Sequence, residues 1–169
     1  MRSGQPLPHL WLMTDERLGD GLPAAVARLP GGAGIVFRHY SLAEPERRTL
    51  FEVVKGAAPG PVLLAGSAEQ ARAWGADGSH GTGTGATTAP AHDLAEIRAA
   101  EAAGAVLIFL SPVFPTRSHP GKPALGVDGF AALAVQTSLP VIALGGMNAA
   151  RATQLRGAYG WAGIDAWAR

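Results

Sequence analysis

Two loops whose residues are suited to anion binding each follow a strongly apolar run. The first, SPVFPTRSHPGKPALG at 111–126, gathers hydroxyl, Arg, His and Lys side chains. The second, GGMN at 145–148, offers the backbone N–H groups of Gly145 and Gly146 ahead of an expected helix that begins at Asn148. N–H groups at such a turn are well placed for phosphate oxygens. The two loops predict a small-molecule site that binds phosphate.

Eight segments that alternate with helical patterns are the predicted strands. They are residues 9–14, 34–40, 61–65, 78–82, 87–92, 105–111, 141–145 and 161–165. Runs that are apolar on both faces are typical of buried parallel strands. Eight of them with crossover helices favour a (β/α)8 TIM barrel, an α/β fold, over an open sheet.

The barrel is expected to be shortened at two places, because the chain is short for this fold. GSHGTGTGATT at 78–88 reduces the helix between strands four and five, and no C-terminal helix follows strand eight. Elsewhere, helices are expected to begin at the capping residues Ser41, Ser67 and Asp93.

Composition narrows the function classes. Hydrophobic residues make up 47% of the 169-residue chain and charged residues 16%, which predicts one folded domain over residues 1–169. The formal net charge of +1 gives no field for nucleic acid or an anionic membrane. There are no cysteines, and we find neither a signal peptide nor a membrane-spanning run. The expected location is cytoplasmic.

A homo-oligomer is an open alternative to a monomer, because exposed Trp161 and Trp167 would suit a partner chain on the strand-eight side.

The chain resembles the thiamine-phosphate synthase/TenI family over nearly its whole length. The motifs are ADG at 76–78 followed by His80, SPVFPT at 111–116, and PVIALGG at 140–146. The resemblance implies a site at the C-terminal mouth of the barrel that binds a thiazole phosphate. In the synthase branch this thiazole is joined to a pyrimidine diphosphate with magnesium. In the TenI branch a thiazole carboxylate phosphate is isomerised without metal.

The residues that match the family's magnesium ligands favour the second branch. The resemblance places Gly66 and Gly85 where the synthase has carboxylates, and Mg²⁺ requires oxygen ligands of that kind. In the run IVFRHY at 35–40, Arg38 is retained as one cation where the family has two. We therefore expect metal-free proton transfer, no cofactor and no metal ligands.

The same resemblance assigns the candidate site residues. His92 matches a family histidine on which tautomerisation is thought to depend, and histidine suits proton transfer near neutral pH. The expected catalytic residues are His92, with Tyr40 and His80 as second proton carriers or orienting groups. The expected substrate and phosphate contacts are Arg38, Thr116, Ser118, Lys122, Gly145 and Gly146.

Alternatives remain at this point. Each histidine is also compatible with a structural role at the rim or in a turn. Asp165 replaces a family serine and would repel a phosphate unless Lys122 or Arg38 neutralises it. A true synthase would have to hold magnesium through groups such as Asp15 or Asp165. A phosphate-binding module without catalysis is the third interpretation.

Overall fold

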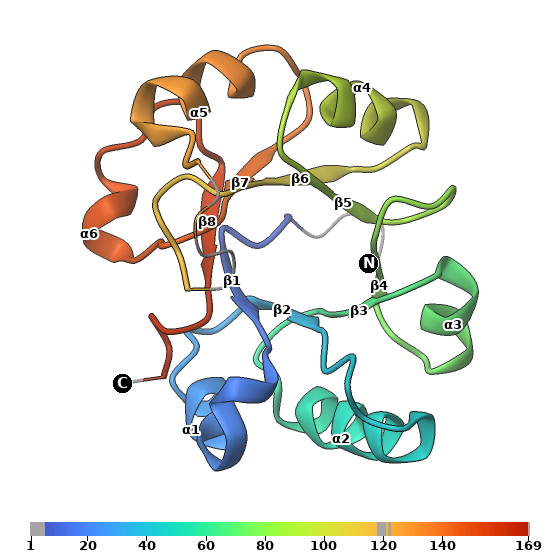
Figure 1. Ribbon diagram of the computed structural model, residues 1–169. Coiled ribbons are helices and arrows are strands. Elements are labelled where there is room, and N and C mark those ends of the chain that lie inside the picture. The colour runs from blue at the N-terminus through green and yellow to red at the C-terminus, as the bar shows by residue number, and fades with distance from the viewer. Residues whose placement is uncertain (1–5, 118–120, 122, 169) are drawn as a thin grey trace.

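A closed barrel of eight parallel strands forms the centre of the molecule, and helices surround it (Figure 1). The computed structural model describes residues 6–117, 121 and 123–168. The strands are β1 (Leu10–Met13), β2 (Gly34–Phe37), β3 (Val62–Ala65), β4 (Gly78–His80), β5 (Thr88–Ala91), β6 (Leu107–Leu110), β7 (Val141–Ala143) and β8 (Gly160–Gly163). The helices are η1 (Glu16–Gly21, 3-10), α1 (Leu22–Ala27), α2 (Glu44–Ala57), α3 (Ala68–Ala73), α4 (Leu94–Ala102), α5 (Gly126–Ala134) and α6 (Ala149–Ala152). Pairing of β1 with β8 closes the barrel, so the predicted fold is confirmed.

The connection between β4 and β5 is shortened, as expected. Between β4 and β5 the described chain forms turns and no helix, and none follows β8 up to residue 168. The outer face of β8 is covered instead by two stacked indoles, Trp161 and Trp167, whose ring centroids are 5.1 Å apart at an interplanar angle of 1°. Both rings are half-buried rather than exposed, and Trp167 Nε1 donates to the Trp11 carbonyl at 3.1 Å. This contact accounts for both tryptophans within the chain.

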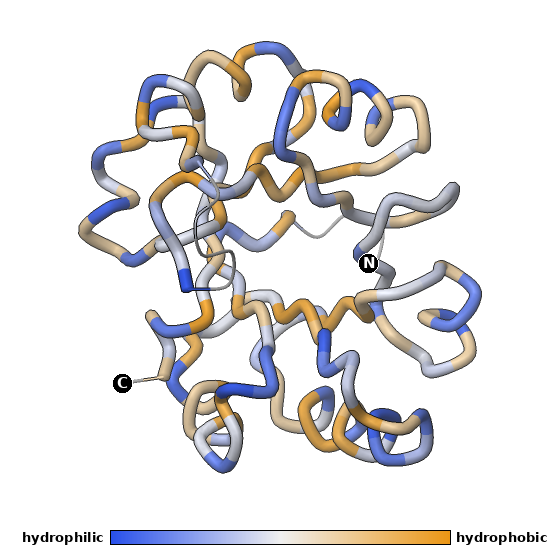
Figure 2. Tube along the Cα trace, viewed as in Figure 1, coloured by the Kyte–Doolittle hydropathy of each residue, from blue (hydrophilic) through white to orange (hydrophobic). Residues whose placement is uncertain are grey.

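The core has an inner and an outer layer. Trp11 on β1 and His80 on β4 both contact the Phe109 ring on β6, at 5.3 and 4.9 Å between centroids. Neither pair lies on neighbouring strands, so these contacts cross the barrel interior. Outside, Phe37 of β2 packs on Phe51 of α2. Apolar residues accordingly concentrate along the strands, and hydrophilic residues on the outward turns of the helices (Figure 2).

Helix capping was predicted correctly at two of the three capping residues. Ser67 and Asp93 accept from the backbone N–H groups of Gln70 and Glu96, as expected of N-caps. The prediction for Ser41 was wrong, because α2 begins after Ala43 and Ser41 donates to the Glu16 carboxylate instead.

The helix expected after residue 148 is also shorter than predicted. Asn148 caps it through its side chain, but α6 has only four residues. Among the helices of the described ranges, none combines the length and apolar character of a bilayer-spanning segment.

Candidate functional site

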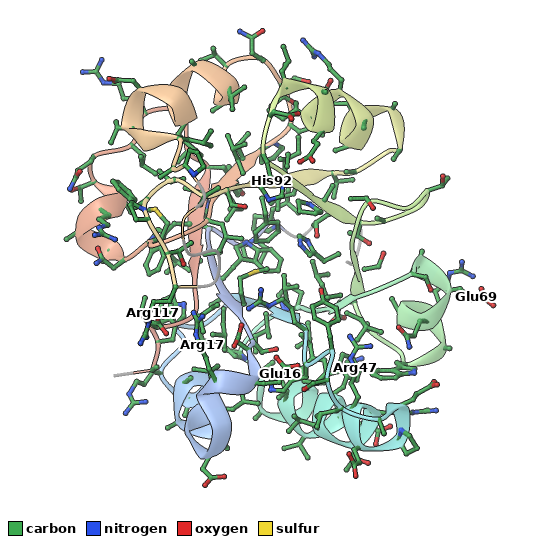
Figure 3. All side chains as sticks on the ribbon, viewed as in Figure 1. Glu16, Arg17, Arg47, Glu69, His92 and Arg117 are labelled. Atoms are coloured by element: carbon green, nitrogen blue, oxygen red, sulfur yellow. The ribbon has the colours of Figure 1, made fainter. Side chains whose placement is uncertain are left out.

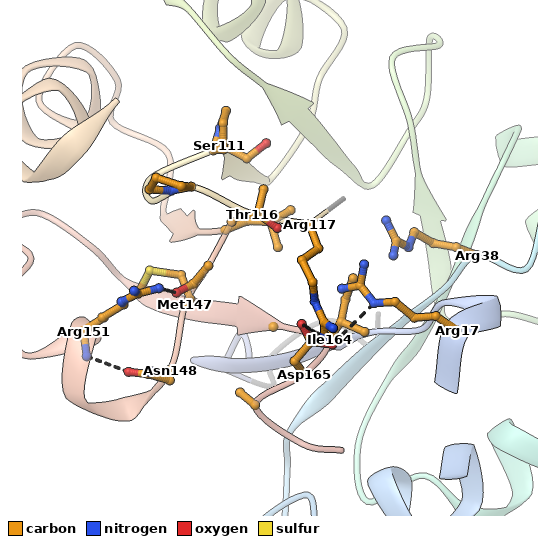
Figure 4. Close-up of a pocket in the computed structure, with 17 residues that line it drawn as sticks. Arg17, Arg38, Ser111, Thr116, Arg117, Met147, Asn148, Arg151, Ile164 and Asp165 are labelled. Carbon is orange, nitrogen blue, oxygen red and sulfur yellow. Dashed lines mark hydrogen bonds and ion pairs between the residues drawn. The ribbon is translucent and has the colours of Figure 1, made fainter. Parts of the chain in front are cut away.

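A pocket of about 420 Å³ opens at the carboxyl ends of β6, β7 and β8 (Figure 4). Its lining residues are Arg17, Arg38, Ser111, Pro112, Pro115, Thr116, Arg117, Leu144, Gly145, Gly146, Met147, Asn148, Arg151, Gly163, Ile164, Asp165 and Ala166. In parallel α/β barrels the loops at this end of the strands build the ligand site. The pocket lies where the sequence predicted one.

The turn after β7 requires glycine at two consecutive positions. Gly145 and Gly146 have φ values of 95° and 62°, a backbone conformation that residues with a Cβ rarely adopt. A Cβ on Gly145 would lie 2.7 Å from Pro112 Cα, and one on Gly146 would lie 2.7 Å from the Pro115 carbonyl oxygen. The turn therefore packs directly against the loop that follows β6.

The carbonyl groups of this turn are hydrogen-bonded to the β6 loop, whereas its N–H groups are not used in this way. The carbonyls of Leu144 and Gly145 accept from the N–H groups of Val113 and Phe114 at 2.8 and 3.1 Å, which fixes the β6 loop. The N–H groups of Gly145, Gly146 and Met147 donate to no acceptor among the described residues. Consecutive N–H groups of this kind form a concavity for anions. Because α6 is so short, these loop amides, rather than a helix dipole, are the relevant donors.

Four arginines make the pocket strongly cationic. Arg151 donates to the Gly146 carbonyl, and its guanidinium stacks on the Phe114 ring at 4.8 Å. Arg17, Arg38 and Arg117 come from η1, from the residues after β2 and from the β6 loop. One lining carboxylate, Asp165, opposes these four charges, which leaves the described wall at a formal +3.

Arg38, a predicted contact, is held rigidly at the pocket wall. Its Nε donates to the Thr14 carbonyl and its Nη2 to Asp15 Oδ2, both at 2.7 Å. Burial lowers the pKa of Arg38, and the neighbouring Asp15 charge opposes that shift. An arginine remains protonated in such surroundings, so Arg38 contributes a fixed positive charge.

The structure brings four of the six predicted phosphate contacts together. Arg38, Thr116, Gly145 and Gly146 all line the pocket. Ser118 and Lys122 lie outside the described residues, and so does His119. Of the two partners expected to neutralise Asp165, Lys122 is thus not described and Arg38 does not pair with Asp165. It pairs with Arg17 at 3.4 Å and with Arg117 at 3.0 Å, whereas Arg38 pairs with Asp15.

None of the three predicted catalytic residues lines this pocket. His92 follows β5 on the same end of the barrel, and Figure 3 shows it set apart from Arg17 and Arg117. Its Nδ1 lies 2.7 Å from Glu96 Oε2, and its side chain is 42% exposed. The Glu96 carboxylate therefore fixes the imidazole at the rim with Nδ1 occupied.

Tyr40 lies at the surface of the molecule, whereas His80 lies in the barrel interior. The φ of 37° at His39 ends the extended alternation of β2, so Tyr40 is 65% exposed and stacks with Arg47 at 5.6 Å. His80 is buried in the barrel interior with its Nδ1 3.0 Å from Thr88 Oγ1. Burial lowers the pKa of His80 to about 4, and the nearby Arg38 charge acts in the same direction. At neutral pH the His80 imidazole is therefore uncharged.

Three arginines of the pocket, Arg17, Arg117 and Arg151, were not predicted. Arg117 lies within the 111–126 loop, so its position carried a signal. Arg17 follows Asp15 after the first strand, and Arg151 lies three residues after the N-cap Asn148. No motif distinguishes these last two from ordinary surface arginines.

The mouth does not fit a magnesium site in the described part of the chain. The two carboxylates that the sequence offered for a metal, Asp15 and Asp165, are both paired with arginines. No cluster of three histidine or carboxylate side chains occurs among the described residues. Mg²⁺ needs oxygen ligands in octahedral geometry, and these two carboxylates are already committed to guanidinium groups.

Comparisons with known protein sequences point to one family. The family described as thiamine monophosphate synthase matches residues 85–167. A thiamine-phosphate synthase from Salinispora tropica is 49% identical over 70 residues, which cover 40% of this chain and 34% of that protein. A putative thiamine-phosphate synthase 2 from Aquifex aeolicus is 40% identical over 77 residues, or 44% of this chain and 41% of that protein. The matches thus span well under two thirds of these relatives' own lengths.

A solved structure extends the agreement to the whole fold. The thiamine phosphate pyrophosphorylase of Pyrococcus furiosus superposes with a TM-score of 0.76, covering 94% of this chain and 86% of that one. Its sequence identity is 21%, so this likeness concerns the fold alone.

Proposed function

We propose that this chain, which belongs to the thiamine-phosphate synthase/TenI family, is an enzyme of thiamine biosynthesis that acts on a thiazole phosphate. The observation that carries the proposal is the turn at Gly145–Met147. Three consecutive N–H groups without an acceptor among the described residues adjoin a wall with four arginines. Such a pocket suits a phosphate monoester, whose oxygens accept several charge-assisted hydrogen bonds.

For the reaction we propose metal-free tautomerisation of the thiazole. His92 removes a proton from one ring position and returns a proton to another, so the net change is an isomerisation that needs no cofactor. Glu96 occupies Nδ1 of His92, which leaves Nε2 as the proton carrier. Because His92 is not a lining residue, the heterocycle has to extend from the β7 turn across the mouth towards β5. Tyr40 and His80 stay candidate orienting groups.

A magnesium-dependent synthase is the second candidate, and the names of the curated relatives favour it. It would join the thiazole phosphate to a pyrimidine diphosphate and release pyrophosphate. The carboxylates in the mouth do not supply a site for the metal, which favours the isomerase. A binding module without catalysis is the third candidate. It is favoured by the observation that His92 does not line the pocket. Cytoplasmic location and homo-oligomerisation stay predictions.

A pair of assays separates these candidates. The first follows isomerisation of a thiazole carboxylate phosphate by NMR in buffer with a metal chelator. The second measures thiamine phosphate formed from the aromatic thiazole phosphate and the pyrimidine diphosphate with Mg²⁺. We expect turnover only in the first assay, and its loss in His92→Asn. Turnover confined to the second assay would establish the synthase instead.

His9→Asn is the matched control for His92→Asn. His9 is also an exposed histidine, but it precedes β1 at the opposite end of the barrel. Isomerisation should continue in His9→Asn. If His92→Asn isomerises the substrate as fast as His9→Asn does, His92 is not the proton carrier.

A further inference from the structure

The carboxylate of Asp165 connects three separate loops at the pocket mouth. Asp165 follows β8, and its Oδ1 lies 3.4 Å from Nε of Arg17 on η1. Its Oδ2 lies 3.0 Å from Nη2 of Arg117 in the loop after β6. Figure 4 shows both guanidinium groups directed at Asp165, while Arg151 lies on the other side of the pocket beside Met147. The ion pairs therefore form a cluster distinct from the β7 turn.

Asp165 is the one acidic side chain on the described pocket wall. The nearby Asp15 accepts a hydrogen bond from Arg38 but does not line the pocket. The Asp165 side chain is 42% exposed and that of Arg117 is 76% exposed. Ion pairs this exposed are weak, so a bound anion can draw the two arginines towards itself. The negative charge of Asp165 nevertheless stays beside the ligand.

We infer that Asp165 is a specificity-determining residue that reduces the advantage a diphosphate group has over a monophosphate in this cationic pocket. The inference rests on the proposed function, since it concerns the same phosphate pocket. The repulsion between Asp165 and a ligand is proportional to the ligand's charge. A carboxylate on the wall therefore disfavours a pyrophosphate trianion more than an orthophosphate dianion. The four arginines without Asp165 would prefer the more highly charged ligand more strongly than the present wall of formal charge +3 does.

The selectivity is consistent with a substrate that carries one phosphate. A pocket that had to retain pyrophosphate as a leaving group would gain from every positive charge and lose from this carboxylate. A carboxylate at this position therefore suits isomerisation of a monophosphate better than transfer that releases a diphosphate.

The test compares the affinities of two inorganic anions for the wild-type chain and for Asp165→Asn, which keeps the side-chain shape. Titration calorimetry with orthophosphate and pyrophosphate is done without metal, at low salt and about pH 8. If the substitution tightens orthophosphate binding about tenfold, proportionality to charge predicts about thirtyfold for pyrophosphate. The ratio of the orthophosphate affinity to the pyrophosphate affinity should therefore fall about threefold.

Two further variants keep the result interpretable. Asp20→Asn removes the same charge at an exposed position of η1 that does not line the pocket, and it should leave both affinities unchanged. Asp165→Ser removes the carboxylate with a smaller side chain and should shift the preference in the same direction as Asp165→Asn. Urea unfolding confirms that each variant is folded.

The outcomes separate the two proposals. An unchanged ratio of the two affinities in Asp165→Asn, with both anions still bound, would overturn the role of Asp165 alone. Binding of neither anion by the folded wild-type chain would overturn the phosphate pocket and the proposed function together.

Discussion

Replacing Gly146 by alanine should damage phosphate binding through the loop that Gly146 contacts. The new Cβ would lie 2.7 Å from the Pro115 carbonyl oxygen, 3.0 Å from Phe114 Cβ and 3.1 Å from Arg151 Nη1. The φ of 62° adds about 1–2 kcal/mol of backbone strain for a residue with a Cβ. Overpacking costs about 1–3 kcal/mol more, so we expect a loss of about 2–5 kcal/mol of stability.

The binding effect follows from the displaced groups. The β6 loop and Arg151 must move away from the β7 turn, which disturbs the donors to the phosphate. Losing one hydrogen bond to a charged group is worth about 1.5–3 kcal/mol, or at least about tenfold in Kd. Titration calorimetry with inorganic phosphate measures this loss, and urea unfolding measures the change in stability.

Gly104→Ala is the matched control for this substitution. Gly104 has a φ of 84° after α4, and a Cβ there would meet nothing within 4 Å. The control should lose only the strain energy and keep its phosphate affinity. If the folded Gly146→Ala chain binds phosphate as tightly as Gly104→Ala does, the β7 turn is not the phosphate site and the reasoning is refuted.

Two further predictions concern the framework of the site. Arg47 donates to the carbonyls of Arg38 and Ala65 and stacks on Trp74 at 5.3 Å. Arg47→Met should therefore lower the free energy of unfolding in urea by about 2–4 kcal/mol, and a change within error of zero would contradict this role. The pKa of His80 is about 4 in the folded state and about 6.5 in the unfolded state. The neutral imidazole therefore contributes fully to the free energy of unfolding above about pH 6.5, and this contribution is lost as pH falls towards 4. The loss should reach about 3 kcal/mol, and it should largely disappear in His80→Asn; an equal pH dependence in both proteins would contradict the assignment.

The sequence was sufficient for the fold because each strand carries its own signal. Apolar runs such as 107–110 and 141–143 are buried on both faces, and the order of these runs along the chain determines the barrel. Gly145 and Gly146 were predictable for a similar reason, since a turn with positive φ needs glycine locally.

The electrostatic arrangement of the site was not predictable in the same way. The pairing of Asp165 with Arg17 joins residues from opposite ends of the chain, and no local pattern encodes it. Tyr40 was expected among the catalytic residues, but the positive φ of His39 interrupts the extended backbone before Tyr40. The contact between His92 and Glu96, by contrast, has the four-residue spacing of a helix and was available in the sequence.

A crystal structure of the chain with inorganic phosphate tests the central claim most directly. We predict one phosphate whose oxygens lie within hydrogen-bond distance of the N–H groups of Gly145, Gly146 and Met147, beside the Arg151 guanidinium. Phosphate bound only outside this pocket, or these N–H groups donating to protein acceptors, would contradict the claim.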